Sequence, residues 1–184
     1  MSIYGNLLSL GGGMKIKSIQ SGNTTCPRSG TEYSTSINRV DLTKSIIFHN
    51  GHVYSTNAAY SQASYARLDT ATSVKCRADN HQNDSGMTVY WTVVEFEDGI
   101  SVQRGLVSEA ASPVGAYYAD VSITAVDLTK AAVVGAGWCP TGSWAATDCG
   151  MYLRSAFYLR VYANAAYYSG GARMYVPWQV VEFK

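Results

Sequence analysis

The sequence predicts an all-β protein: two tandem antiparallel β-sandwich domains from an internal duplication, with an extended N-terminal arm. Three observations lead to this. Charged residues make up only 15% of the chain, while Tyr (14) and Gly (17) are abundant, a balance that suits strands and turns. A block of five residues, Val40–Lys44, occurs a second time without change as Val126–Lys130. A closing segment Trp-x-Val-Val-Glu-Phe also occurs twice.

The matches between the two halves are colinear. Besides the five-residue block, Ser18–Gly22 parallels Ser101–Gly105, and Met87–Phe96 parallels Met174–Phe183. Three matches in the same order are hard to obtain by chance, and a repeat of this size points to a repeated structural unit. We therefore expect one domain at 18–96 and a second at 101–183, with the Asp-Gly turn of 97–100 between them.

Each copy contains short β-branched and aromatic segments that end at turn residues. In the first copy, strands are expected at 46–48, 66–68, 73–78 and 88–96. The closing segment alternates with a period of two but carries apolar side chains on both faces. We therefore expect a central strand that is covered on both sides or faces a neighbouring subunit.

Residues 1–17 lie outside the repeat and form the predicted arm. Residues 1–13 carry no charged side chain and end in three glycines, a composition typical of a hinge. Its apolar residues are Ile3, Tyr4, Leu7, Leu8 and Leu10. Two interpretations stay open: a disordered tail, or an arm that docks into a neighbouring subunit and orders there.

Net charge and hydropathy argue against two classes of partner. The formal net charge is +1, so no general attraction to nucleic acid is expected. No apolar stretch approaches the roughly 20 residues needed for a bilayer span, so we expect no membrane insertion. The first residues do not resemble a signal peptide, and synthesis and folding in a cytoplasm are expected.

Residue types that usually carry catalysis are not arranged for it. His49 and His52 are three apart, which on a regular strand places them on opposite faces, so we expect exposed turn histidines rather than a shared metal. The Asp79–Asp84 loop lacks calcium-loop spacing and is expected to be solvated. No nucleophile elbow, phosphate loop or dinucleotide fingerprint occurs. We predict no enzyme activity, no cofactor and no metal.

The four cysteines show no zinc-type spacing, and free thiols are the default in a reducing compartment. The geometry of a ten-residue separation permits a disulfide between Cys139 and Cys149, and this is left open.

The repeated acids are expected to be structural. Asp41 and Asp127 each precede Leu-Thr-Lys, which suits a turn-capping hydrogen bond. Glu95 and Glu182 lie near strand ends, where a cross-strand Lys or Arg would pair with them.

Aromatic residues gather in expected loops of the second copy. They are Tyr117, Tyr118, Trp138, Trp144, Tyr167 and Tyr168. Loop aromatics can stack on sugars or anchor a protein interface, and they can also cap the ends of a sandwich. All of these readings stay open.

The pattern Lys-Ser-Ile-Gln-x-Gly, then Ile-x-x-Val-Asp-x-x-Lys-Ser, Ala-x-Leu and Trp-x-Val-Val-Glu-Phe resembles small β-rich proteins encoded among the structural genes of tailed bacteriophages. These look distantly similar to H-type lectin-like domains, six-stranded sandwiches that assemble as trimers and bind N-acetylgalactosamine-type sugars. The resemblance covers nearly all of both copies. None of the lectin family's sugar-binding residues can be matched onto this chain.

This resemblance implies a virion structural protein of a tail, baseplate, fibre or capsid decoration, located in the virion. Its expected partners are other virion proteins and further copies of the chain, with a homotrimer favoured. The alternative is a glycan-binding receptor module that contacts a host-surface glycan through the aromatics of the second copy.

Overall fold

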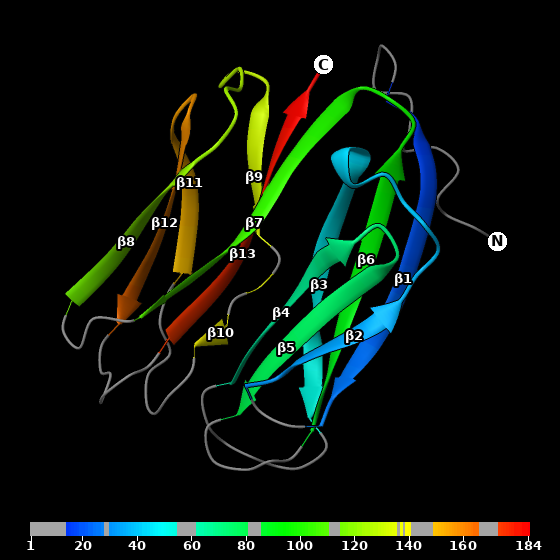
Figure 1. Cartoon of the computed structure of the whole chain (residues 1–184), viewed down its shortest axis with the longest axis vertical. Coiled ribbons are helices and arrows are strands. Elements are labelled where there is room, and N and C mark those ends of the chain that lie inside the picture. Colours follow the sequence, from blue (N-terminus) through cyan, green and yellow to red (C-terminus); the bar gives the residue numbers. More distant parts are fainter. Residues whose placement is uncertain are drawn as a thin grey trace.

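A computed structural model describes residues 14–27, 30–54, 62–80, 86–110, 115–135, 137, 139–140, 149–165 and 173–184. The described chain is all-β, apart from one short 3-10 turn (Figure 1). The first half contains β1 (Ile16–Cys26), β2 (Glu32–Ser36), η1 (Leu42–Lys44), β3 (Ser45–Tyr54), β4 (Gln62–Thr70), β5 (Ser73–Asn80) and β6 (Met87–Phe96). The second half contains β7 (Ile100–Ala110), β8 (Gly115–Ser122), β9 (Ala131–Gly135), β10 (Cys139–Pro140), β11 (Cys149–Ser155), β12 (Tyr158–Ala165) and β13 (Arg173–Phe183).

Within the described residues the strands form four small antiparallel sheets that pack in pairs. In the first half, β1-β6-β3 packs against β2-β5-β4. In the second half, β7 and the consecutive segments β9 and β10 flank β13, and this sheet packs against β11-β12-β8. The predicted all-β, sandwich-like fold is thereby confirmed, and the four expected strands fall within β3 to β6. No helix of the described chain is long and apolar enough to cross a membrane.

The two halves share one strand order and one register. Gly22 pairs with Trp91 in the first half, and Gly105 pairs with Trp178 in the second. In both, the indole covers the glycine so closely that a Cβ on Gly22 would lie 2.7 Å from the Trp91 ring. Strands β3 and β9 meet their central strands at matching positions as well. The residues of the central strand pairs therefore have positional equivalents in the other half, as do those of β3 from Ser45 to His49.

Each half has its own core. In the first, Trp91, Val89 and Val93 of β6 pack on Val74 and Cys76 of β5. In the second, Trp178 and Val180 of β13 pack on Leu159 and Val161 of β12. A fully buried Val or Leu contributes about 1.5–3 kcal/mol relative to an exposed one. The burial follows the alternation along β6, in which the inward residues are buried and Tyr90 faces outward.

A third cluster joins the halves. Ile46 of β3 packs with Ile100, Val102 and Val181 of the second half, and Phe96 and Val134 border them. Figure 1 shows the β7-β13-β9 sheet in the middle of the molecule, between the β8-β12-β11 sheet and the strands of the first half.

The two closing strands, β6 and β13, were expected to be central in their sheets, and this is confirmed. Both β6 and β13 are central in their sheets. Strand β13 is covered on both sides, because Trp178 faces its own core while Gln179 and Val181 are buried against the first half. On the outer face of β6, Tyr90 is exposed, Thr92 and Val94 are half-buried, and Phe96 borders the cluster that joins the halves.

Candidate interaction surfaces

The repeated acids hold the same turn in both halves. Asp41 accepts hydrogen bonds from the backbone N–H and hydroxyl of Thr43, and Asp127 does the same with Thr129. The backbone N–H of Asp41 donates to Glu95 (2.9 Å), which also accepts from Lys17. The turn-capping prediction is confirmed, as is the cross-strand cation for Glu95.

Glu95 illustrates how burial and partners compete. Burial alone would raise the pKa of its carboxyl, but the Asp41 N–H, the Lys17 ammonium and the Ser18 hydroxyl outweigh that, and the pKa lies below its ordinary value. The ionised carboxylate therefore holds the turn that begins at Asp41. In the second half Glu182 accepts from the backbone N–H of Asp127 and the hydroxyl of Ser101.

Gln179 of β13 closes an open strand edge of the first half. Its side-chain amide accepts from the N–H of Ile47 (2.9 Å) and donates to the C=O of the same residue (2.7 Å). Strand β3 pairs with β6 on its other side, so the amide takes the place of a further strand. Gln179 and Ile47 are both buried, and a buried backbone group left without a partner costs about 1–3 kcal/mol.

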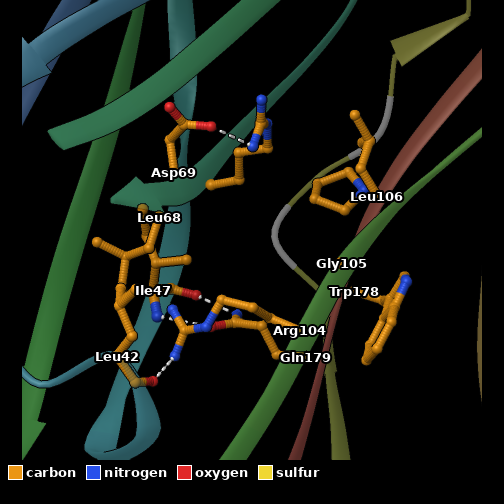
Figure 2. Close-up of a pocket in the computed structure, with 11 residues that line it drawn as sticks. Leu42, Ile47, Leu68, Asp69, Arg104, Gly105, Leu106, Trp178 and Gln179 are labelled. Atoms are coloured by element: carbon orange, nitrogen blue, oxygen red, sulfur yellow. Dashed lines mark hydrogen bonds and ion pairs between the residues drawn. The ribbon is translucent and has the colours of Figure 1, made fainter. Parts of the chain in front are cut away.

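Arg104 of β7 binds the same edge (Figure 2). Its guanidinium donates to the C=O of Leu42 and to the C=O of Ser45. Burial lowers the pKa of Arg104 to about 10, so the side chain stays charged at neutral pH. Together, Arg104 and Gln179 anchor one half to the other through backbone groups of η1 and β3.

A cleft of about 270 Å³ lies beside these contacts. Arg67, Leu68 and Asp69 line it from the first half, and Leu106 and Trp178 line it from the second (Figure 2). Arg67 and Asp69 form an ion pair (2.7 Å). The cleft is small compared with common ligand pockets, which occupy about 300–1,000 Å³, and it belongs to the junction between the halves.

Arg104 and Gln179 belong to no motif that predicted a functional site. The available signal was a difference within the repeat, because their positional equivalents in the first half are Ser21 and Thr92. A long polar side chain that replaces a short one in an otherwise repeated strand indicates a contact that only one copy makes.

His49 and His52 lie together, contrary to the expectation of opposite faces. A β-bulge interrupts the pairing of β3 with β6 between them, and Gly51 within it has a φ of 97°. The extra residue turns both rings to the same side. His49 Nε2 and His52 Nδ1 each lie 2.7 Å from the Ser64 hydroxyl. The histidines are half-buried in a strand rather than exposed in a turn.

The two histidines and Ser64 form a partly buried hydrogen-bonded cluster. Burial lowers the pKa of His49 to about 4, and the nearby His52 adds to this, so the rings are neutral at neutral pH. Ser64 is buried, and Gly137 of the second half packs directly over it. Among the described residues no set of three His, Cys, Asp or Glu side chains is grouped for a metal ion.

A charged and aromatic surface covers the outer face of β8-β12-β11. Asp120 pairs with Arg160 (2.7 Å) and Arg154, and the guanidinium of Arg160 lies 5.3 Å from the centre of the Tyr118 ring. The hydrogen bond from Arg160 and the two positive charges hold the pKa of Asp120 down at about 2. Tyr152 and Tyr162 lie next to each other on the same face. Planar polar groups beside exposed rings can bind hydroxyl-rich ligands or a protein.

Of the six aromatic residues that the sequence predicted to lie in loops, the structure describes the backbone of two. Tyr117 and Tyr118 belong to strand β8 rather than to a loop, which corrects that prediction, and the Tyr118 side chain is exposed. The Tyr117 side chain and residues Trp138, Trp144, Tyr167 and Tyr168 lie outside the described parts. The predicted arm residues, Ile3 to Leu10, and most of the Asp79–Asp84 loop also lie outside them.

Three of the cysteines are described as free thiols. Cys26 and Cys76 are buried in the first core, and burial raises the pKa of Cys26 to about 11 and that of Cys76 to about 12. Cys149 is also a free thiol, its pKa raised by burial to about 11. The side chain of Cys139 lies outside the described parts, so the pairing of Cys139 with Cys149 stays an open prediction.

Comparison with known proteins returned no protein-family model, no curated protein and no solved structure that matches this chain.

Proposed function

We propose that the protein is a structural component of a bacteriophage virion, in a tail, baseplate, fibre or capsid decoration, and that it acts by binding other subunits. The observation that carries the proposal is a set of large apolar side chains exposed on one sheet face. Ile19, Phe48 and Tyr90 stand on the outer side of β1-β6-β3, exposed by 54%, 40% and 40%. These side chains surround a polar centre, in which the Thr92 hydroxyl bonds Ser21 and Asn50. Large apolar side chains exposed together on one sheet face favour a protein interaction site.

The proposal also holds that the two halves arose by duplication. Support comes from the shared registers and from hydrogen bonds that recur position by position. Gln20 bonds the N–H and C=O of Asn38, and Gln103 bonds the N–H and C=O of Thr124. Three duplicated chains present six similar sandwiches, which suits a place where a sixfold tail or capsid position meets a threefold spike.

The proposal is tested on particles. Virions of the phage that carries this gene are purified on a density gradient, and antibody to the purified protein is used for immunogold electron microscopy. We expect gold at one fixed site on the particle. A protein that is abundant in the lysate but missing from the purified particles contradicts a structural role, with a known capsid protein as the positive control.

The second candidate function is binding of a host-surface glycan. The surface around Tyr118, Asp120 and Arg160 favours it, because an exposed ring beside hydrogen-bonding charged groups is a common sugar-binding arrangement. In this reading the second half meets the host while the first half meets the particle.

A glycan array separates the two functions. Binding that is lost in Tyr118→Ala and in Trp138→Ala, but kept in Tyr90→Ala on the other half, supports the glycan reading. No binding across a broad array argues against it and leaves the assembly function unaffected.

A further inference from the structure

The contact between the two halves uses different surfaces on each side. The first half contributes an edge made of η1, β3 and β4: the C=O groups of Leu42 and Ser45, and both backbone groups of Ile47. The second half contributes the outer face of its β7-β13-β9 sheet, chiefly Arg104 and Gln179. Such a contact is heterologous, and by its nature it leaves one unused copy of each surface.

The unused face belongs to the first half. Matching the two registers gives each contact residue of the second half an equivalent in the first. Val102, Arg104, Pro177, Gln179 and Val181 correspond in order to Ile19, Ser21, Tyr90, Thr92 and Val94. Val134 of β9 corresponds to Phe48 of β3. In the second half this face is covered by the first half, whereas in the first half Ile19, Phe48 and Tyr90 are exposed.

The unused edge belongs to the second half. Strand β9 pairs with β13, and residues 131–135 pair with no other described strand, while Gly137 just beyond them forms a bridge to Tyr65 of β4. Leu128 holds the position of Leu42, which Arg104 binds in the first half, and it is 51% exposed. Tyr152 of β11 holds the position of Arg67, which lines the junction cleft, and it is 45% exposed. The edge is therefore bordered by large apolar side chains that match an apolar face.

We propose that a second copy of this chain docks here: the open edge of one chain, with Leu128 and Tyr152, packs on the open face of the next, with Ile19, Phe48 and Tyr90. The proposal rests on the assembly function above and names its partner. The contact between chains then repeats the contact within a chain, and a series of such contacts closes into a ring if its rotation allows. The polar anchors differ, because the short Ser21 and Thr92 stand where Arg104 and Gln179 stand within the chain. The contact between chains is accordingly more apolar.

The two surfaces can be disabled one at a time. Ile19→Asp places a charge on the face, and Leu128→Asp places the same charge on the edge. Tyr118→Asp is the control of similar exposure (56%), because Tyr118 lies on β8, at the opposite edge of its sheet from the β11 strand that carries Tyr152. Native mass spectrometry and light scattering report the mass, and circular dichroism checks that each variant folds.

We expect the unaltered chain and the Tyr118→Asp variant to form the same closed oligomer, and each of the other two variants to be monomeric. Mixing Ile19→Asp with Leu128→Asp should restore one contact, because the first keeps its edge and the second keeps its face. The product is a one-to-one dimer that grows no further. An isologous dimer interface gives no such rescue.

A monomeric unaltered chain overturns the proposal, as does a folded Ile19→Asp variant that keeps the full oligomer mass, or a mixture that stays monomeric where the unaltered chain assembles. The outcome is distinct from that of the particle test. A chain that is monomeric in solution but present in virions contradicts this inference and leaves the proposed function standing. A chain that forms the oligomer but is absent from virions contradicts the proposed function and leaves this inference standing.

Discussion

Two glycines are required by their tryptophan neighbours. A Cβ on Gly105 would lie 2.6 Å from the Trp178 ring, closer than side chains tolerate, and the backbone on both sides is fixed by the ladder to β13. We expect Gly105→Ala to lower the free energy of unfolding by about 1–3 kcal/mol, the usual cost of overpacking a core.

Gly135→Ala is the control for this prediction, because the nearest atom there is the flexible end of Met151 at 3.2 Å. Urea denaturation measures both variants. Equal effects of the two substitutions would show that close packing on the indole is not the reason for the glycine.

The half-buried His49 predicts acid sensitivity. Its folded pKa of about 4 lies below the value of about 6.5 for an unfolded histidine. Between these values the unfolded chain binds more protons, so the contribution of His49 to stability is fully present above the unfolded pKa and is lost as the pH falls toward the folded one. We expect His49→Asn to show a shallower loss of unfolding free energy over this window.

The neighbouring His52 also has a pKa lowered by burial, and it supplies a residual slope in the variant. The two curves should become parallel at lower pH, where carboxylates shared by both proteins titrate. Identical slopes throughout the histidine window would contradict the burial of a neutral ring at His49.

At the scale of elements, side chains replace a missing strand along β3. Gln179→Leu keeps the size of the side chain but leaves the N–H and C=O of Ile47 buried without their partner. We expect the free energy of unfolding to fall by about 2–4 kcal/mol. This is the summed cost of two buried backbone groups without partners, each at the lower end of the usual range of about 1–3 kcal/mol.

Gln103→Leu is the matched control. Gln103 makes the same pair of bonds, to the N–H and C=O of Thr124, but in an exposed position where water can replace it. Its loss should stay below about 1 kcal/mol, the net value of an ordinary hydrogen bond. If denaturation gave equal losses for Gln103→Leu and Gln179→Leu, the edge of β3 would not depend on the second half.

An element could be predicted from the sequence where its contacts are made within one strand, one turn or one core, and not where they reach the other half. Alternation along 88–96 predicted a central strand, and Asp41 predicted its own cap, because both depend on neighbours in sequence or on one core. The bulge between His49 and His52 was not predicted, because the dipeptide Asn50-Gly51 is typical of the end of a strand. One extra residue in a strand moves every later side chain to the opposite face of the sheet. Arg104 and Gln179 were not predicted because their partners are backbone groups of the other half.

At the scale of the whole molecule, the buried junction should make the halves unfold together. Val102 is buried against the first half, while its equivalent Ile19 is exposed. Val102→Asp places an unpaired charge in the junction, at a cost of about 3–5 kcal/mol for comparable buried charges. We expect the single unfolding transition of the unaltered chain to separate into two in this variant.

Ile19→Asp makes the same chemical change at the equivalent position, and its monomer should keep one transition. Circular dichroism and tryptophan fluorescence followed on the same samples detect the separation, because each half contains its own core tryptophan. Two transitions already present in the unaltered chain would contradict a coupled pair of sandwiches.

The central claim, that the contact within the chain is repeated between chains, is tested most directly by cross-linking. Ser21 and Leu128 are the equivalents of Arg104 and Leu42, which touch within the chain. A chain with Ser21→Cys, Leu128→Cys and Cys139→Ser is treated with a short bismaleimide, while Cys26, Cys76 and Cys149 react slowly because burial raises their pKa values. The account predicts covalent oligomers up to the full assembly, and neither single-cysteine variant should give products beyond a dimer. An assembled protein in which these two positions do not cross-link between chains would contradict it.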